Sequence, residues 1–154
     1  MTQVLYGDRL GKQGQLRLGT SAILFDENQR VLLTRRTDNG QWCLPGGAMD
    51  SGESAAEACI REVWEETSLH VRVKRLVGVY SDPNQLVIYP DANKVFVVAL
   101  SFEVAIVGGE LGLSNETTDA GFFSVTEMDA LTMLGNHKQR VEDALMNRAE
   151  AFVK

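Results

Sequence analysis

Residues 47 to 69 read GAMDSGESAAEACIREVWEETSL, and this stretch places Glu62, Glu65 and Glu66 three and four residues apart. On a helix of about 3.6 residues per turn, this spacing stacks the three carboxylates on one face. Like charges at such positions repel one another and destabilise a bare helix. A hard divalent cation removes the repulsion because it binds carboxylate oxygens. The stretch therefore predicts a metal-binding helix face, and metals held by carboxylates commonly act on phosphates.

The elements around this stretch alternate between strand and helix patterns. Ser54 and Glu57 form a capping-box signature, so the acidic helix is expected to begin at Ala55 and to end near Thr67. A second amphipathic helix is expected over residues 137–152. The Pro/Asn/Asp-rich segment between residues 81 and 94 is expected to be a mobile loop. Strand patterns cover residues 18–25 and 30–35, which are expected to form a hairpin around a turn at 26–29, and residues 70–80, 94–106 and 121–125.

The acidic stretch resembles the Nudix box of the Nudix hydrolases, G-x5-E-x7-R-E-U-x-E-E-x-G-U, in which U is a bulky aliphatic residue. Ser68 is the one departure, because it stands where the family pattern has glycine. The resemblance extends to GQWCLPGG at 40–47, TRR at 34–36 and NETTDAGFFS at 115–124, and it covers most of residues 18 to 131. The residues in register with the box are Gly47, Glu53, Arg61, Glu62, Val63, Glu65, Glu66 and Leu69.

This resemblance implies an α/β fold, namely a Nudix-type α/β/α sandwich with a mixed sheet between helices. It also implies hydrolysis of a diphosphate linkage that depends on Mg2+ or Mn2+. Divalent ions neutralise the phosphates, hold them and activate the attacking water, and a spare glutamate takes the proton. No covalent residue is needed.

The metal ligands follow partly from spacing and partly from the resemblance. Glu62 and Glu66 are the expected principal ligands, with Glu65 either a ligand or a neighbour of the ligands. The family pattern adds the backbone carbonyl of Gly46, although Pro45-Gly46-Gly47 is also readable as a plain turn.

Other site residues are carried over from the resemblance alone. Glu116 is the candidate auxiliary ligand or base, so that the catalytic candidates are Glu62, Glu65 and Glu116, with Asp119 the alternative to Glu116. Arg36 matches a position that contacts substrate phosphates in some members, or it is merely solvated. In the family, residues at the positions of Glu53 and Arg61 form a structural ion pair.

The substrate is the least determined part of the prediction. We favour a nucleoside diphosphate linked to a sugar or an alcohol, similar to ADP-ribose or a CDP-alcohol. The alternatives are a MutT-like enzyme that cleaves oxidised nucleoside triphosphates and a non-catalytic Nudix domain that senses nucleotides. Tyr89, in the expected loop, either contacts the base or sugar or packs the loop onto the core.

Composition agrees with a single domain over residues 1–154. Of the residues 44% are hydrophobic and 23% charged, and no apolar run approaches the roughly 20 residues that span a membrane. No signal peptide is evident, and Cys43 and Cys59 are expected to be reduced thiols, which favours a cytoplasmic protein. The net charge of -6 argues against general binding of nucleic acid. His70 and His137 are expected to be structural or exposed. Homodimers are common in the Nudix family, which this sequence resembles.

Overall fold

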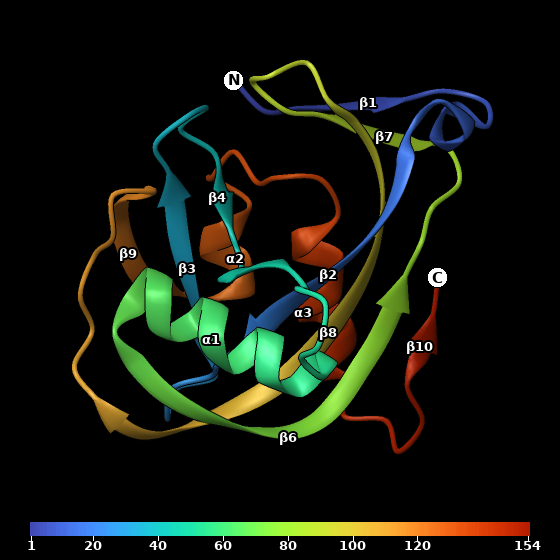
Figure 1. Ribbon diagram of the computed structural model, residues 1–154. Coiled ribbons are helices and arrows are strands. Elements are labelled where there is room, and N and C mark those ends of the chain that lie inside the picture. The colour runs from blue at the N-terminus through green and yellow to red at the C-terminus, as the bar shows by residue number, and fades with distance from the viewer.

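The computed structural model describes residues 1–154 and contains two sheets flanked by helices (Figure 1). The larger sheet runs in the order β1-β7-β8-β2-β5, and β6 pairs with both β8 and β10. It is mixed, because β2 and β8 are parallel whereas β6 and β8 are antiparallel. Its strands are β1 (Gln3–Tyr6), β2 (Gln15–Ile23), β5 (Gly46–Ala48), β6 (Leu69–Tyr80), β7 (Gln85–Ile88), β8 (Lys94–Gly109) and β10 (Phe152–Val153).

The smaller sheet has three strands in the order β4-β3-β9, with β4 at Trp42–Cys43, β3 at Val31–Arg36 and β9 at Thr117–Phe123. Trp42 packs edge-on against Phe123, with ring centroids 4.9 Å apart. This contact gives Trp42 a packing role in the smaller sheet.

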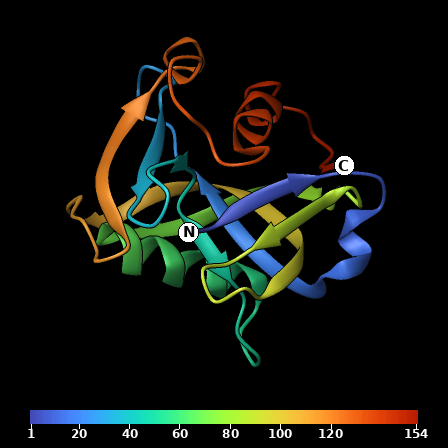
Figure 2. The same ribbon diagram turned by 90° about the horizontal axis from the view of Figure 1, so that it is seen from above.

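Helices cover both faces of the larger sheet. Helix α1 (Ala55–Thr67) lies on one face, and α3 (His137–Leu145) lies on the other (Figure 2). The short helix α2 (Val125–Met128) follows β9, and a 3-10 helix at Leu10–Gln13 precedes β2. This arrangement confirms the predicted α/β/α sandwich with a mixed sheet.

The core divides at β2 because successive side chains of a strand point to opposite faces. Ala22 packs in the cluster that contains Cys59 and Val63 of α1. Ile23, the next residue, packs in the cluster that contains Val141 of α3. These five residues are each at most 1% exposed. Burial of these apolar faces holds the two helices on the sheet.

The hairpin expected over residues 18–35 is wrong in its main part. Around the turn, Phe25 bridges Val31 and the Leu32 amide donates to Leu24. Beyond these contacts the two strands diverge, since β2 pairs with β8 and β5 while β3 pairs with β4 and β9. Local alternation identified both strands, but it carried no information about their partners.

Three further boundaries differ from the sequence prediction. The segment expected as one loop between residues 81 and 94 contains β7, which pairs with β1 and β8. Strand β9 ends at Phe123 and α2 begins at Val125, so the expected strand over 121–125 lies too far along the chain. Helix α3 ends at Leu145 instead of continuing to residue 152, and Phe152 belongs to β10.

The helix α3 ends early for a local reason. Asn147 has a left-handed backbone, with φ of 50°, which does not continue a helix. In addition, the guanidinium of Arg75 donates hydrogen bonds to the carbonyls of Ala144 and Arg148, at 2.9 and 3.4 Å. These bonds satisfy carbonyls that a longer helix would have used.

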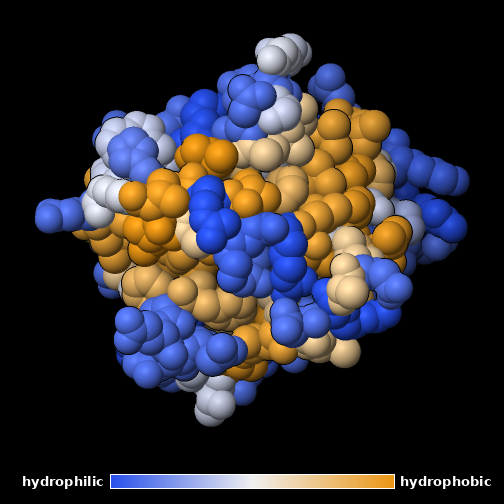
Figure 3. All heavy atoms as spheres, turned by 90° about the horizontal axis from the view of Figure 1, so that it is seen from below, coloured by the Kyte–Doolittle hydropathy of each residue, from blue (hydrophilic) through white to orange (hydrophobic).

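Apolar side chains are also found at the surface. Figure 3 shows a face with broad apolar areas separated by hydrophilic side chains. Exposed apolar residues include Trp64, Ile106, Leu111 and Leu113.

The homodimer expected from the resemblance stays a prediction. None of the helices is long and apolar enough to cross a membrane.

Candidate active site

Helix α1 begins where the capping box predicts. The Ser54 hydroxyl accepts a hydrogen bond from the Glu57 amide, and the Glu57 carboxylate accepts one from the Ser54 amide, both at 3.1 Å. These two bonds satisfy amide groups that would otherwise be free at the start of the helix. The helix therefore presents Glu62, Glu65 and Glu66 in the expected phase.

Glu66 contacts the glycine turn before α1. Its Oε2 accepts the Gly46 amide at 3.3 Å. Strand β5 runs so close to β2 that a Cβ on Gly46 would lie 2.1 Å from the carbonyl oxygen of Thr20, and a Cβ on Gly47 would lie 2.5 Å from the Glu62 carboxyl carbon. Only glycine at both positions allows the turn to approach the sheet and the acidic side chains.

Burial raises the pKa of Glu66 to about 8, and the nearby carboxylates of Glu62 and Glu116 push it in the same direction. The bond from Gly46 and the charge of Arg36 oppose this shift only in part. Burial likewise raises the pKa of Glu62, whose side chain is 14% exposed. The site therefore gathers negative charge that the protein does not fully neutralise.

Arg61 is bonded to three of the box glutamates. Its guanidinium lies 2.7 Å from Glu53, 2.9 Å from Glu62 and 3.2 Å from Glu65. It also donates to the Ala48 carbonyl at 3.0 Å. The ion pair between Arg61 and Glu53 that the family pattern implied is thus present.

Glu116 reaches the same region from the loop before β9. Together with Glu65 and Glu66 it lines a hollow that also contains Ser114 and Asn115. Hydrogen bonds hold the loop, because the Glu116 amide donates to the Ser114 hydroxyl at 3.2 Å and its carbonyl accepts the Thr37 amide at 3.0 Å.

Asp119 does not share this position. It lies on β9 opposite Arg35, and its carboxylate accepts the Ala120 amide at 2.8 Å. Of the two acids weighed as the auxiliary group, Glu116 is therefore the one beside the box glutamates.

The acidic residues fit a hard divalent cation by their chemistry. Four carboxylates gather here, and their mutual repulsion is what such an ion relieves. As the side chains lie, no three acidic, His or Cys groups form a ready cage. Arg61 holds Glu62 and Glu65, so ion binding requires these side chains to turn toward Glu66. Ligation by Glu62, Glu65, Glu66 and Gly46 stays a prediction.

Arg36 lies between the acidic face and a neighbouring pocket. Asp38 holds it through bonds to Nε at 2.9 Å and to Nη2 at 3.2 Å, and Thr2 accepts from Nη2 at 3.3 Å. Its positive charge opposes the rise in the pKa of Glu66. It is therefore ordered by its partners.

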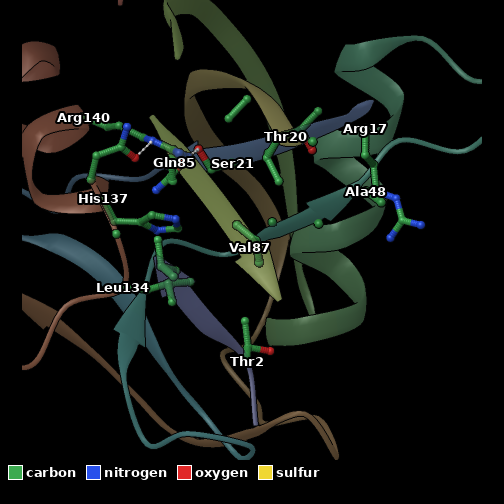
Figure 4. Close-up of a pocket in the computed structure, with 18 of the residues that line it drawn as sticks. Thr2, Arg17, Thr20, Ser21, Ala48, Gln85, Val87, Leu134, His137 and Arg140 are labelled. Atoms are coloured by element: carbon green, nitrogen blue, oxygen red, sulfur yellow. Dashed lines mark hydrogen bonds between the residues drawn. The ribbon is translucent and has the colours of Figure 1, made fainter. Parts of the chain in front are cut away.

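The pocket beside the acidic face lies between β1, β2, β5, β7, β8 and the start of α3 (Figure 4). Tyr89 lines it, at the turn that joins β7 to β8, and the guanidinium carbon of Arg17 lies 6.0 Å from the Tyr89 ring centre. Gly46, Gly47 and Arg36 form the edge that it shares with the acidic face. No Asp or Glu lines this pocket, although the chain carries a net charge of -6.

The sequence prediction missed the polar residues of this pocket. His137 was expected to be structural or exposed, and its Nδ1 accepts the Leu44 amide at 3.0 Å, which is a structural contact; its place in the pocket was not predicted. Arg140, Ser21 and Thr20 also line it and were not predicted. These residues come from β2 and α3, and no local motif joins them. The one signal in the sequence was Arg140, a charged residue on the buried side of the amphipathic helix α3.

Comparison with known proteins agrees with this fold and site. The sequence profile of the NUDIX domain family matches residues 15–145. The chain is 32% identical over 123 residues to an ADP-ribose pyrophosphatase of Methanocaldococcus jannaschii. This alignment covers 78% of this chain and 68% of the relative. It is 33% identical over 125 residues to a putative 8-oxo-dGTP diphosphatase of Bacillus subtilis, covering 81% and 77% of the two chains.

A crystal structure of an ADP-ribose pyrophosphatase from Streptococcus suis superimposes with a TM-score of 0.70 at 28% identity, over 90% of this chain and 98% of that one. The chain belongs to the Nudix family, and it is a pyrophosphohydrolase that acts on phosphorus-containing anhydrides. Nudix hydrolases generally use divalent metals and act on small nucleotide substrates.

Proposed function

We propose that this enzyme hydrolyses the diphosphate linkage of a nucleoside diphosphate joined to a second moiety, with Mg2+ or Mn2+ as the cofactor. The observation that carries the proposal is the shared edge at Gly46 and Gly47, where the acidic face meets a pocket without acidic residues. A diphosphate bound at this edge lies against the acidic face, and the nucleoside attached to it lies in the pocket.

In this arrangement Glu62 and Glu66, with the Gly46 carbonyl, are the proposed ligands of the ion. When bound, the ion supplies charge neutralisation to the phosphates and an activated water. Glu116 or Glu65 takes the proton from the attacking water, because both border the hollow next to Glu66. Arg36 binds a phosphate oxygen from the opposite side.

Within this substrate class the sequence favours ADP-ribose or a CDP-alcohol. Two of the similar proteins are named for ADP-ribose, which supports a sugar diphosphate more directly than it supports a particular base. A MutT-like activity on nucleoside triphosphates is the second candidate. The name of the Bacillus subtilis relative favours it.

A hydrolysis assay tests the proposal. ADP-ribose, CDP-choline and 8-oxo-dGTP are each incubated with the enzyme and Mg2+ or Mn2+, and the products are identified by mass, with a chelator as the control. We expect a nucleoside monophosphate and a phosphorylated sugar or alcohol from either ADP-ribose or CDP-choline. Release of pyrophosphate from 8-oxo-dGTP alone would favour the MutT-like activity. Hydrolysis that persists in chelator would contradict the role of the metal.

A further inference from the structure

Arg140 is a buried cation without an anionic partner. The residue is 6% exposed, and it forms no ion pair with any carboxylate. Its Nε donates to Asn136 at 2.9 Å and its Nη1 donates to Ser21 at 3.2 Å, whereas its Nη2 makes no hydrogen bond. Nη2 is not among the fully enclosed polar atoms, and Arg140 lines the pocket, so this donor stays available to a molecule in the pocket.

The neighbouring groups hold Arg140 in place. Its guanidinium carbon lies 5.1 Å from the centre of the Tyr80 ring, and Ser21 in turn contacts the Ser101 hydroxyl at 2.6 Å. Burial lowers the pKa of Arg140 to about 10, so the side chain still carries its positive charge at neutral pH. The charge is therefore fixed in position at the pocket wall (Figure 4).

His137 adds a second donor to the same wall. Its Nδ1 accepts the Leu44 amide, so the proton of the neutral ring resides on Nε2. Burial lowers the pKa of His137, and the charges of Arg140 and Arg36 lower it further, which keeps the ring neutral. A neutral ring in this tautomer offers the pocket a donor and no acceptor.

The rest of the pocket is lined by both polar and apolar residues. Thr20 lies in the wall, but its unpartnered hydroxyl oxygen is fully enclosed by the protein and does not reach the pocket. The apolar residues that line the pocket include Val4, Leu18, Val87, Val97, Ala99 and Leu134, and the polar residues Thr2, Arg17 and Gln85 line it as well. Apolar walls suit a flat ring, and the polar groups at one end suit the edge of that ring.

We propose that this pocket binds the nucleobase and that Arg140, with His137, reads an edge that presents only hydrogen-bond acceptors. This proposal rests on the diphosphate hydrolysis proposed above and replaces its choice of base. Guanine offers O6 and N7 side by side, which match a guanidinium, and uracil offers O4. Adenine and cytosine present an amino group at the corresponding position, and its donors would point at a fixed positive charge. Guanine and uracil nucleotides are then preferred over the adenine and cytosine nucleotides that the sequence favours.

A matched set of substrates tests the preference directly. GDP-, UDP-, ADP- and CDP-glucose differ only in the base, so kcat/KM values in Mg2+ report base selection alone. We expect the kcat/KM of GDP-glucose or UDP-glucose to exceed those of both ADP-glucose and CDP-glucose by at least about tenfold, which is within the range that one good bidentate contact provides. Equal values for the four, or a preference for ADP-glucose or CDP-glucose, overturn the proposal.

Binding without catalysis separates the proposal from the proposed function. The affinities of GMP, IMP and AMP are measured by calorimetry in chelator. IMP keeps O6 and N7 but lacks the amino group of guanine, so it should bind like GMP, and AMP should bind at least about tenfold more weakly. If the glucose nucleotides are not hydrolysed but this order holds, the hydrolysis proposal fails and the base assignment stands. Equal binding of the three overturns the base assignment.

Variants test whether Arg140 causes the base preference. Arg140→Gln should reduce the difference between GMP and AMP to less than about threefold, and Arg72→Gln, an exposed arginine on β6, should leave it unchanged. If Arg140→Gln weakens both nucleotides equally, the guanidinium holds a phosphate and the base assignment is overturned. If Arg140→Gln does not fold, the order of the three nucleotides on the natural protein still decides the question.

Discussion

Arg61 and Glu53 form a two-pronged ion pair, in which Nε lies 3.0 Å from Oε2 and Nη2 lies 2.7 Å from Oε1. Glu53 also accepts the Asp50 amide at 2.7 Å. The turn before α1 is thus tied to the helix that carries the acidic face. Because Arg61 also contacts Glu62 and Glu65, this pair sets where the predicted ligands lie.

Glu53→Gln tests this positioning role. The change weakens the bond to Arg61 and frees the turn, so we expect activity to fall about ten- to a hundredfold, as for other groups that orient ligands. The metal concentration for half activation should rise. Glu27→Gln, on the exposed turn between β2 and β3, is the control and should behave like the natural protein. Unchanged metal activation in Glu53→Gln would show that the turn stays in place without the pair.

Glu66→Gln tests the predicted metal ligand itself. Loss of one carboxylate that stabilises transition-state charge should lower kcat by at least about a hundredfold. Circular dichroism should show that the fold is retained. Glu142→Gln, an exposed position on α3, serves as the matched control. Near-normal turnover of Glu66→Gln in Mg2+ would refute the ligand assignment.

The stability of the metal-free enzyme should depend on pH through Glu66. Its pKa rises from 4.5 to about 8 on folding, so the folded state holds this proton more tightly than the unfolded state. The contribution is present in full below pH 4.5 and is lost as the pH rises toward 8. Thermal melts in chelator should show this loss for the natural protein and a flatter profile for Glu66→Gln. The same pH dependence in both proteins would exclude Glu66 as its source.

Ser68→Gly tests the departure from the box. Ser68 has φ of 61° and ψ of 15°, a left-handed conformation, and its side chain makes no hydrogen bond. This conformation costs a residue with a Cβ about 1 kcal/mol, so glycine should stabilise the fold by up to about that amount without changing the chemistry.

Ser51→Gly is the control for that substitution. Ser51 is exposed and does not have a positive φ, so glycine there gains nothing in the folded state and loosens the unfolded chain. Chemical denaturation of both variants gives the comparison. A Ser68→Gly protein less stable than the natural one would show that the serine has a stabilising contact at the end of α1.

Tyr89→Ala tests the wall of the pocket. Truncation removes the ring beside Arg17, so we expect KM to rise for the preferred substrate and the ranking of ADP-ribose, CDP-choline and 8-oxo-dGTP to change. Tyr89→Phe keeps the ring and is the control. The metal dependence should stay the same. A uniform loss of activity with a lower melting temperature would favour a packing role.

The sequence by itself determined the helix and its acidic face. The capping box and the spacing of Glu62, Glu65 and Glu66 are local, since they depend on one helix of known pitch. The contact between Arg61 and Glu53, eight residues apart, also followed from the box pattern. The mixed sandwich followed from the resemblance, and the structure agrees with it.

Only the tertiary structure decided how the strands pair and what the pocket contains. Strands β2 and β3 are neighbours along the chain, yet they join different sheets, because their partners lie far away in sequence. The bond between Ser21 and Arg140 spans 119 positions. Local patterns report which side of an element is apolar, but they do not report which distant side chain meets it. The acidic face could therefore be predicted from sequence, whereas the arginine of the pocket wall could not.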